Sequence, residues 1–193
     1  MPKGRLEAFT DGVIAIIITI MVLELKVPDG FELDSLLTLA PKLLIYLLSF
    51  VFVGIYWMNH HHMLHATQKV TGGILWANLS LLFWLSLFPF VASWMGENLF
   101  RPLPTAAHGL ILWMAGISYL VLQKSIIAAD GDNSVLKKAV GNDWKGKVTF
   151  VLIALSVIFS FIQPGLSFII YILITIIWMV PDRRIEKVLM DDV

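Results

Sequence analysis

The sequence predicts an all-α membrane protein with six transmembrane helices in each subunit, and three observations support this fold class. The chain has 193 residues, of which 58% are hydrophobic and only 15% charged, and its mean hydropathy is +0.82. Soluble proteins average roughly half apolar and about a quarter charged residues, and a chain this short has too little interior to bury the excess. The apolar residues also gather in runs that approach the roughly 20 residues a helix needs to cross a bilayer. These observations exclude a soluble enzyme, a disordered tail and a nucleic-acid-binding protein.

All six predicted spans belong to a single domain, residues 1–193. Lys3 and Arg5 precede the first apolar run as in a signal peptide, but no small-residue cleavage site follows, so we expect a retained helix. Pro89 is expected to kink the third span. The last apolar stretch, residues 148–180, is too long for one helix to cross a bilayer, and Gln163-Pro164-Gly165 near its middle divides it in two. The predicted spans are about 6–26, 41–63, 72–95, 106–128, 147–163 and 165–181.

The charged residues give the spans an orientation. Six spans place both termini on one side, and eleven of the 14 cations then fall on that side, leaving only Lys26, Lys42 and Arg101 on the other. Basic residues accumulate in cytoplasmic loops of membrane proteins. Both termini are therefore predicted to be cytoplasmic.

The sequence argues against several mechanisms of transport and catalysis. With no cysteine, it has no disulfide, thiolate metal site or cysteine nucleophile. The fourth to sixth spans carry no acid or base at their centres, which disfavours an ion-coupled pump. Neither an arginine-rich voltage-sensing helix nor a TVGYG filter is present.

The first span carries a continuous stripe of small and aliphatic residues with one hydroxyl. At 100° per residue, a sector about 100° wide contains five residues: Gly12, Ile16, Thr19, Ile20 and Leu23. Asp11 points away from it, toward where neighbouring helices would lie. The alternative is that the stripe is ordinary helix–helix core.

Polar residues of the first three spans are predicted to share one depth near the cytoplasmic surface. A buried aspartate is tolerated when a basic group pairs with it, so we expect a network that joins these three helices. Its members are Arg5, Asp11, His60 and His61, with Trp57 and Asn78 beside them. The alternative is that the histidines lie among lipid headgroups. His61 and His65 have a spacing that can bind zinc, but no acid or cysteine completes the set, so no metal site is expected.

Motifs in the first three spans resemble a known family. Arg5, Phe9, Thr10 and Asp11 form R-x-x-x-F-T-D, which resembles the R-x-x-x-F-S-D signature of the transmembrane protein 175 family of lysosomal potassium channels. Ser49-Phe50, Trp57-x-x-His60-His61 and Trp76-x-Asn78 follow in the same order.

The resemblance implies a potassium-selective channel rather than an enzyme. A single-repeat chain resembles the bacterial form, a homotetramer in the bacterial inner membrane whose first helices line a central pore that K⁺ crosses passively, without a cofactor. Ile16, Ile20 and Leu23 would form constriction rings, Thr19 the selectivity layer, and Arg5, Phe9, Asp11 and His61 part of the structural network. The alternatives are a poorly selective or proton-permeable cation leak, a non-conducting membrane scaffold and a histidine-based metal-binding membrane enzyme.

Overall fold

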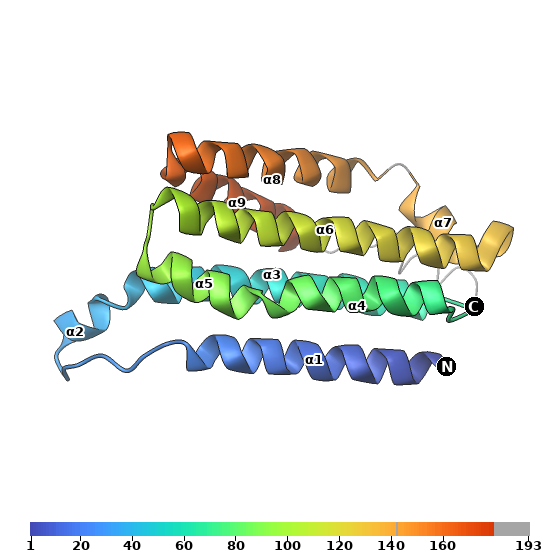
Figure 1. Cartoon of the computed structure of the whole chain (residues 1–193), viewed down its shortest axis with the longest axis horizontal. Coiled ribbons are helices and arrows are strands. Elements are labelled where there is room, and N and C mark those ends of the chain that lie inside the picture. Colours follow the sequence, from blue (N-terminus) through green and yellow to red (C-terminus); the bar gives the residue numbers. More distant parts are fainter. Residues whose placement is uncertain (142, 180–193) are drawn as a thin grey trace.

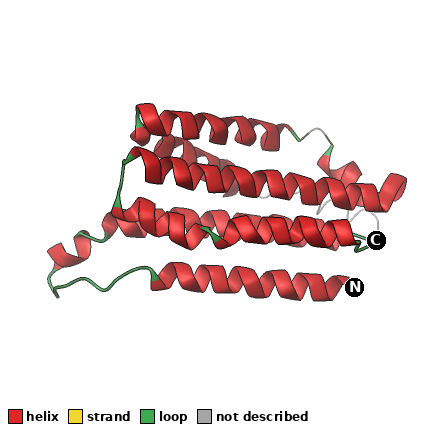
Figure 2. Ribbon diagram, viewed as in Figure 1, coloured by secondary structure: helices red, strands yellow, loops and turns green. Residues whose placement is uncertain are grey.

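The computed structural model describes residues 1–141 and 143–179, and within them every regular element is a helix (Figures 1 and 2). This confirms the predicted all-α class. The elements are α1 (Lys3–Leu23), α2 (Leu33–Leu37), α3 (Ala40–His65), α4 (Gly72–Ser86), α5 (Phe88–Glu97), α6 (Pro102–Asp130), the 3₁₀ turn η1 (Gly131–Asn133), α7 (Val135–Val140), α8 (Trp144–Ile162) and α9 (Pro164–Met179).

The structure confirms a multi-pass membrane protein by helix length and composition. Five segments are long and apolar enough to cross a bilayer: Lys3–Leu23, Ala40–His65, Gly72–Glu97, Pro102–Asp130 and Trp144–Ile162. Pro164–Met179 is a shorter apolar helix of 16 residues. The last two residues of the sixth predicted span, 180–181, lie outside the described residues.

Prolines mark the two breaks in the apolar segments. The third predicted span is not one helix: α4 ends at Ser86 and α5 begins at Phe88, with Pro89 in its first turn. Proline has no N–H to donate and its ring crowds the preceding turn, so the helix is interrupted there. Gln163 alone separates α8 from α9, which begins at Pro164, as the turn signal predicts.

The long helices form a bundle with α1 along one edge (Figure 1). The main partners of α1 are α3, α4 and α5, whereas α6 packs against α4, α5, α8 and α9. Buried serines tie the α8–α9 hairpin: Ser167 Oγ donates to the Ser156 carbonyl (2.6 Å) and Ser160 Oγ lies 3.2 Å from Ser167 Oγ. Because α1 lies at the edge of the bundle and its main partners are α3, α4 and α5, one side of α1 is packed and the other faces away from the bundle.

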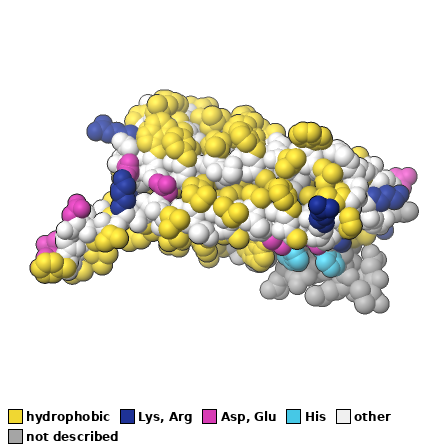
Figure 3. All heavy atoms as spheres, turned by 60° about the horizontal axis from the view of Figure 1, so that its bottom comes forward, with side chains coloured by type: hydrophobic (Ala, Val, Ile, Leu, Met, Phe, Trp, Pro, Cys, Tyr) yellow, Lys and Arg dark blue, Asp and Glu magenta, His cyan; other side chains and the backbone are white. Residues whose placement is uncertain are grey.

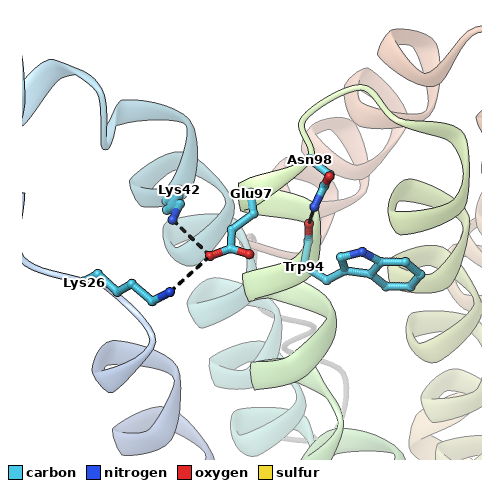
Figure 4. Close-up of polar contacts among 5 residues, drawn as sticks. All are labelled: Lys26, Lys42, Trp94, Glu97 and Asn98. Atoms are coloured by element: carbon cyan, nitrogen blue, oxygen red, sulfur yellow. Dashed lines mark hydrogen bonds and ion pairs between the residues drawn. The ribbon is translucent and has the colours of Figure 1, made fainter.

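Polar contacts join the elements at each end of the bundle. At the N-terminal end of α1, Lys3 Nζ donates to the His65 carbonyl at the end of α3 (3.0 Å). At the opposite end Glu97 of α5 accepts from Lys42 of α3 (3.2 Å) and pairs with Lys26 after α1 (3.7 Å; Figure 4). Apolar side chains cover the middle of the face in Figure 3, and charged ones lie mostly toward its ends.

Candidate functional site

The buried side of α1 is defined by residues spaced three or four apart. These are Leu6, Thr10, Ile14, Ile17 and Met21, each at most 3% exposed. A spacing of three and four keeps side chains on one face of an α-helix. This face fixes α1 against α3, α4 and α5.

The opposite side of α1 carries the stripe predicted from the sequence, and it is uncovered. Ile16, Ile20 and Leu23 are 60%, 43% and 75% exposed, and Gly12 and Thr19 are exposed as well. Within the described chain, the stripe therefore does not form helix–helix core.

The hydroxyl of Thr19 has a defined orientation within the stripe. Thr19 Oγ1 donates its proton to the Ala15 carbonyl one turn earlier, at 2.8 Å. The oxygen keeps two acceptor lone pairs. Because the side chain is exposed, this oxygen can offer those lone pairs to a cation outside the helix.

Arg5 and Phe9 extend the uncovered side toward the N-terminus. Both are exposed, and at 100° per residue they fall on the same side of the helix as Ile16. Arg5 makes no ion pair with any of the described residues; the pairs found there are Lys26–Glu97, Lys42–Glu97 and Lys137–Asp132. Asp11 follows Arg5 by six residues, which places the two about 120° apart around the helix.

A fully buried polar network joins α1 to α3 and α4. Asn78 Nδ2 donates to Thr10 Oγ1 (2.9 Å), and Asn78 Oδ1 lies 2.7 Å from His60 Nε2. Thr10 and Asn78 are 0% exposed and His60 is 2% exposed. Burying a polar group without a hydrogen-bond partner in an apolar interior is costly. Thr10, Asn78 and His60 can therefore be buried here because they are hydrogen-bonded to one another.

A second polar contact lies nearby on the exposed rim of α1. Trp57 Nε1 donates to Asp11 Oδ1 at 2.9 Å. The ring of His61 packs at 6.5 Å from that of Trp57. Asp11, Trp57 and His61 are all exposed.

The structure thus divides the predicted network into two sets. His60 and Asn78 meet in the buried set, Asp11, Trp57 and His61 in the exposed set, and Arg5 joins neither by an ion pair within the residues described. Thr10, which links α1 to Asn78 of α4, was not among the predicted network residues. Its position inside the R-x-x-x-F-T-D motif was the available signal.

His108 is a second residue that sequence reasoning passed over. It is fully buried near the start of α6, and its ring packs against Phe88 (5.7 Å) and Tyr171 (5.4 Å). Neither ring nitrogen has a hydrogen-bond partner among the described residues. His108 packs here as an aromatic side chain.

The exposed histidines do not form a metal cage in the described part of the chain. The rings of His61 and His65 lie 6.3 Å apart. No group of three or more histidine, aspartate or glutamate side chains there could hold a metal ion.

The chain is a helical multi-pass protein in which α1 leaves a hydroxyl-bearing face uncovered, and comparison with known proteins places it among channel subunits. Residues 5–89 match the family described as endosomal/lysosomal potassium channel TMEM175. A protein from Chryseobacterium sp. (strain P1-3) named as a potassium channel is 49% identical over 192 residues, covering 100% of both chains. The human protein named endosomal/lysosomal proton channel TMEM175 is 35% identical over 96 residues, 43% of this chain and 19% of its own.

A solved structure extends the likeness to the whole fold. The crystal structure of a lysosomal potassium-selective channel TMEM175 homologue from Chamaesiphon minutus superposes with a TM-score of 0.82 at 28% identity, covering 93% of this chain and 97% of that one. The chain belongs to the TMEM175 family. This confirms the resemblance drawn from the motifs.

Proposed function

We propose that four copies of this chain form a potassium-selective channel whose central pore is lined by the uncovered face of α1. The observation that carries the proposal is the contrast on α1, where Ile17 is 2% exposed and the adjacent Ile16 is 60% exposed. The names of the bacterial relatives supply the ion, and the family resemblance supplies the subunit number. The activity proposed is passive conduction of K⁺, with no catalytic step and no cofactor.

The position of α1 supports an oligomer. It lies at one edge of the bundle with its main contacts on one side (Figure 1), so one subunit cannot enclose a path along the stripe. A ring of copies around a common axis would bring the stripes together, because closed rotational symmetry repeats the same surface toward one centre.

The residues of the stripe suit gating and selection. Rings of Ile16, Ile20 and Leu23 would exclude water when narrow and conduct when wide, as hydrophobic constrictions do. Four Thr19 oxygens, with their protons directed to the helix backbone, would replace part of the hydration shell of a cation. The resulting selectivity should be weaker than that of carbonyl filters.

The two polar sets would hold α1 at its place around the pore. The buried set Thr10–Asn78–His60 fixes the helix to α3 and α4, and Trp57 steadies it through Asp11. Arg5 and Phe9 lie on the uncovered side, where a neighbouring subunit could complete their contacts.

The decisive experiment measures K⁺ and Na⁺ flux through purified protein in liposomes. Wild type should pass K⁺ faster than Na⁺. Ile16→Asn, which places a polar amide in the constriction, should raise cation flux or alter its selectivity. The control Ile158→Asn makes the same change on α8 at a similarly exposed position (57%) and should leave flux unchanged. Equal behaviour of both variants would contradict the pore assignment, and absence of any flux from folded tetramers would favour the scaffold alternative.

A proton pathway is the second candidate, because the vertebrate relatives are named proton channels. Proton entry into liposomes under a pH gradient, with N-methylglucamine as the only other cation, separates the two. Proton flux that exceeds K⁺ flux at equal driving force would replace potassium conduction by proton conduction as the main activity.

We also propose that both termini face the cytoplasm of a bacterial cell, with the protein in the inner membrane. The chain has no cysteine, so single cysteines report sidedness without a background. In intact cells, Phe31→Cys, at a 97% exposed position before α2, should react with a membrane-impermeant maleimide. Lys69→Cys between α3 and α4 should react only after lysis, and the reverse pattern would invert the topology.

A further inference from the structure

A cavity of about 90 Å³ lies between α3, α6, α8 and α9, away from α1, and is partly open to the surface of the bundle. Six of the sixteen described residues that line it are aromatic, against 12% of the whole chain: Phe52, Tyr56, Trp113, Tyr119, Phe150 and Trp178. Protein interiors are normally packed with few voids larger than a water molecule. The space is therefore large for a packing defect.

Most polar groups in the wall of the cavity are already bonded within the protein. Asn59 Nδ2 donates to the Ile55 carbonyl (2.9 Å) and Trp178 Nε1 to Thr149 Oγ1 (2.9 Å). Asp143 Oδ1 accepts from the Gly146 N–H (3.2 Å). A buried water requires two to four polar partners. The exception is Trp113 Nε1, which is buried and has no hydrogen-bond partner among the described residues. One open donor is fewer than the two to four partners that a buried water needs, so the wall favours a mainly apolar occupant over ordered water.

The two ends of the cavity differ in polarity along the axis of the bundle. Its lining runs along α3 from Phe52 to Asn59, which is about 10 Å at 1.5 Å per residue. The polar lining residues Asn59, Asp143 and Thr149 lie toward the end of the bundle where α8 begins, and Phe52, Leu112 and Ile153 lie deeper. A ligand would thus meet mainly apolar walls inside, where the polar groups are Trp113 Nε1 and the Tyr56 hydroxyl, which donates to the Leu112 carbonyl (3.4 Å).

We propose that this cavity binds a small neutral aromatic molecule of about one ring. Aromatic rings attract one another in offset and edge-to-face arrangements beyond the area they bury. The walls already contain such pairs, with Trp113 and Phe150 centroids 5.0 Å apart and Tyr56 and Tyr119 6.1 Å apart. An engineered apolar cavity of about 150 Å³ binds benzene, so a single ring has the appropriate scale once the walls adjust slightly.

Gly116 offers a way to fill the cavity without disturbing its surroundings. It lines the space, and a Cβ built there would lie 3.6 Å from Tyr56 Oη, an ordinary contact. Gly116→Leu should occupy the volume that the ligand needs. Gly54→Leu is the matched control, because Gly54 lies outside the lining and a Cβ there meets nothing within 4 Å.

The test uses iodobenzene with the purified full-length protein. Crystals soaked in iodobenzene should show one anomalous iodine peak between α3, α6 and α8 in wild type and Gly54→Leu, and none in Gly116→Leu. In detergent solution, iodobenzene should raise the Tm of wild type and Gly54→Leu in a saturable way, because a ligand that binds only the folded state stabilises it. The Tm of Gly116→Leu without ligand shows that this variant folds.

Three outcomes would overturn the proposal. The first is a wild-type cavity without iodine, and the second is equal occupancy in Gly116→Leu. The third is a peak in crystals with no saturable change of Tm, which means binding at crystal concentration only. Equal occupancy by 1-iodohexane would overturn the assignment to aromatic ligands.

Discussion

The two sides of α1 have similar compositions and lie in opposite environments. Leu6, Ile14 and Ile17 are buried against the bundle, while Ile16, Ile20 and Leu23 are exposed. Both sides are mainly aliphatic, so hydrophobicity alone does not distinguish them. The polar groups do: Thr10 on the buried side is bonded to another helix, and Thr19 on the uncovered side is bonded to its own backbone. A change on the buried side should therefore cost stability, and a change on the uncovered side should alter conduction.

The largest effect on stability is expected for Asn78→Ala. The substitution leaves Thr10 and His60 without their buried partner, and each unsatisfied group costs about 1–3 kcal/mol. We expect a loss of about 3 kcal/mol in the free energy of unfolding, measured by denaturant titration in detergent. Asn98→Ala is the control, since among the described residues its side-chain amide bonds only to the Trp94 carbonyl of its own turn (Figure 4). Equal losses for both variants would show that the buried set does not hold α1.

Ile17→Ala and Ile16→Ala test the comparison at adjacent residues. Ile17→Ala leaves a cavity against the bundle and should lower stability by about 2 kcal/mol, at the low end for such changes. Ile16→Ala removes the same atoms from the uncovered side and should leave stability nearly unchanged while it raises ion flux by widening the constriction. Unfolding curves and liposome flux on both variants check this, and an unchanged flux in Ile16→Ala with a large loss of stability would reverse the assignment.

Thr19→Val should change selectivity without changing stability. The substitution keeps the shape of the side chain and removes the oxygen proposed to contact the ion. The ratio of K⁺ to Na⁺ permeability should fall by up to about tenfold, equivalent to roughly 1.4 kcal/mol, measured as a shift in reversal potential. Thr175→Val on α9 removes a similar bond to its own helix backbone and should leave the reversal potential where it is.

Glu97→Gln should have the smallest effect. Its pairs with Lys26 and Lys42 are exposed, and exposed ion pairs contribute little and are screened by salt. We expect a slight decrease in Tm at low ionic strength that disappears in about 1 M salt, where the Debye length is about 3 Å. A large decrease that persists in high salt would show that this cluster fixes the end of α1.

The predictable parts of the fold were those set by local chemistry. The division between α8 and α9 follows from Pro164, which cannot donate a backbone hydrogen bond. The stripe of Ile16, Thr19 and Leu23 follows from helical periodicity, and the structure leaves it uncovered as a pore-lining surface requires. The flux experiment tests its proposed place in the pore.

The parts that could not be predicted depend on which helices become neighbours. Asn78 bonds to Thr10, 68 residues away, and Trp57 rather than Arg5 contacts Asp11. The predicted depth of these residues in the membrane put them at one level. It did not tell toward which neighbouring helix each side chain points. His108 was overlooked because its role comes from Phe88 and Tyr171, which belong to other helices.

The sequence by itself determined that this protein is a bundle of membrane-spanning helices. The cost of leaving so many apolar residues in water allows few other outcomes, and period and proline placement set where helices begin and end. Only the tertiary structure decided which side of α1 is buried. Both sides of that helix are apolar enough for either environment, so the choice rests on shape and on the pairing of Thr10 with Asn78.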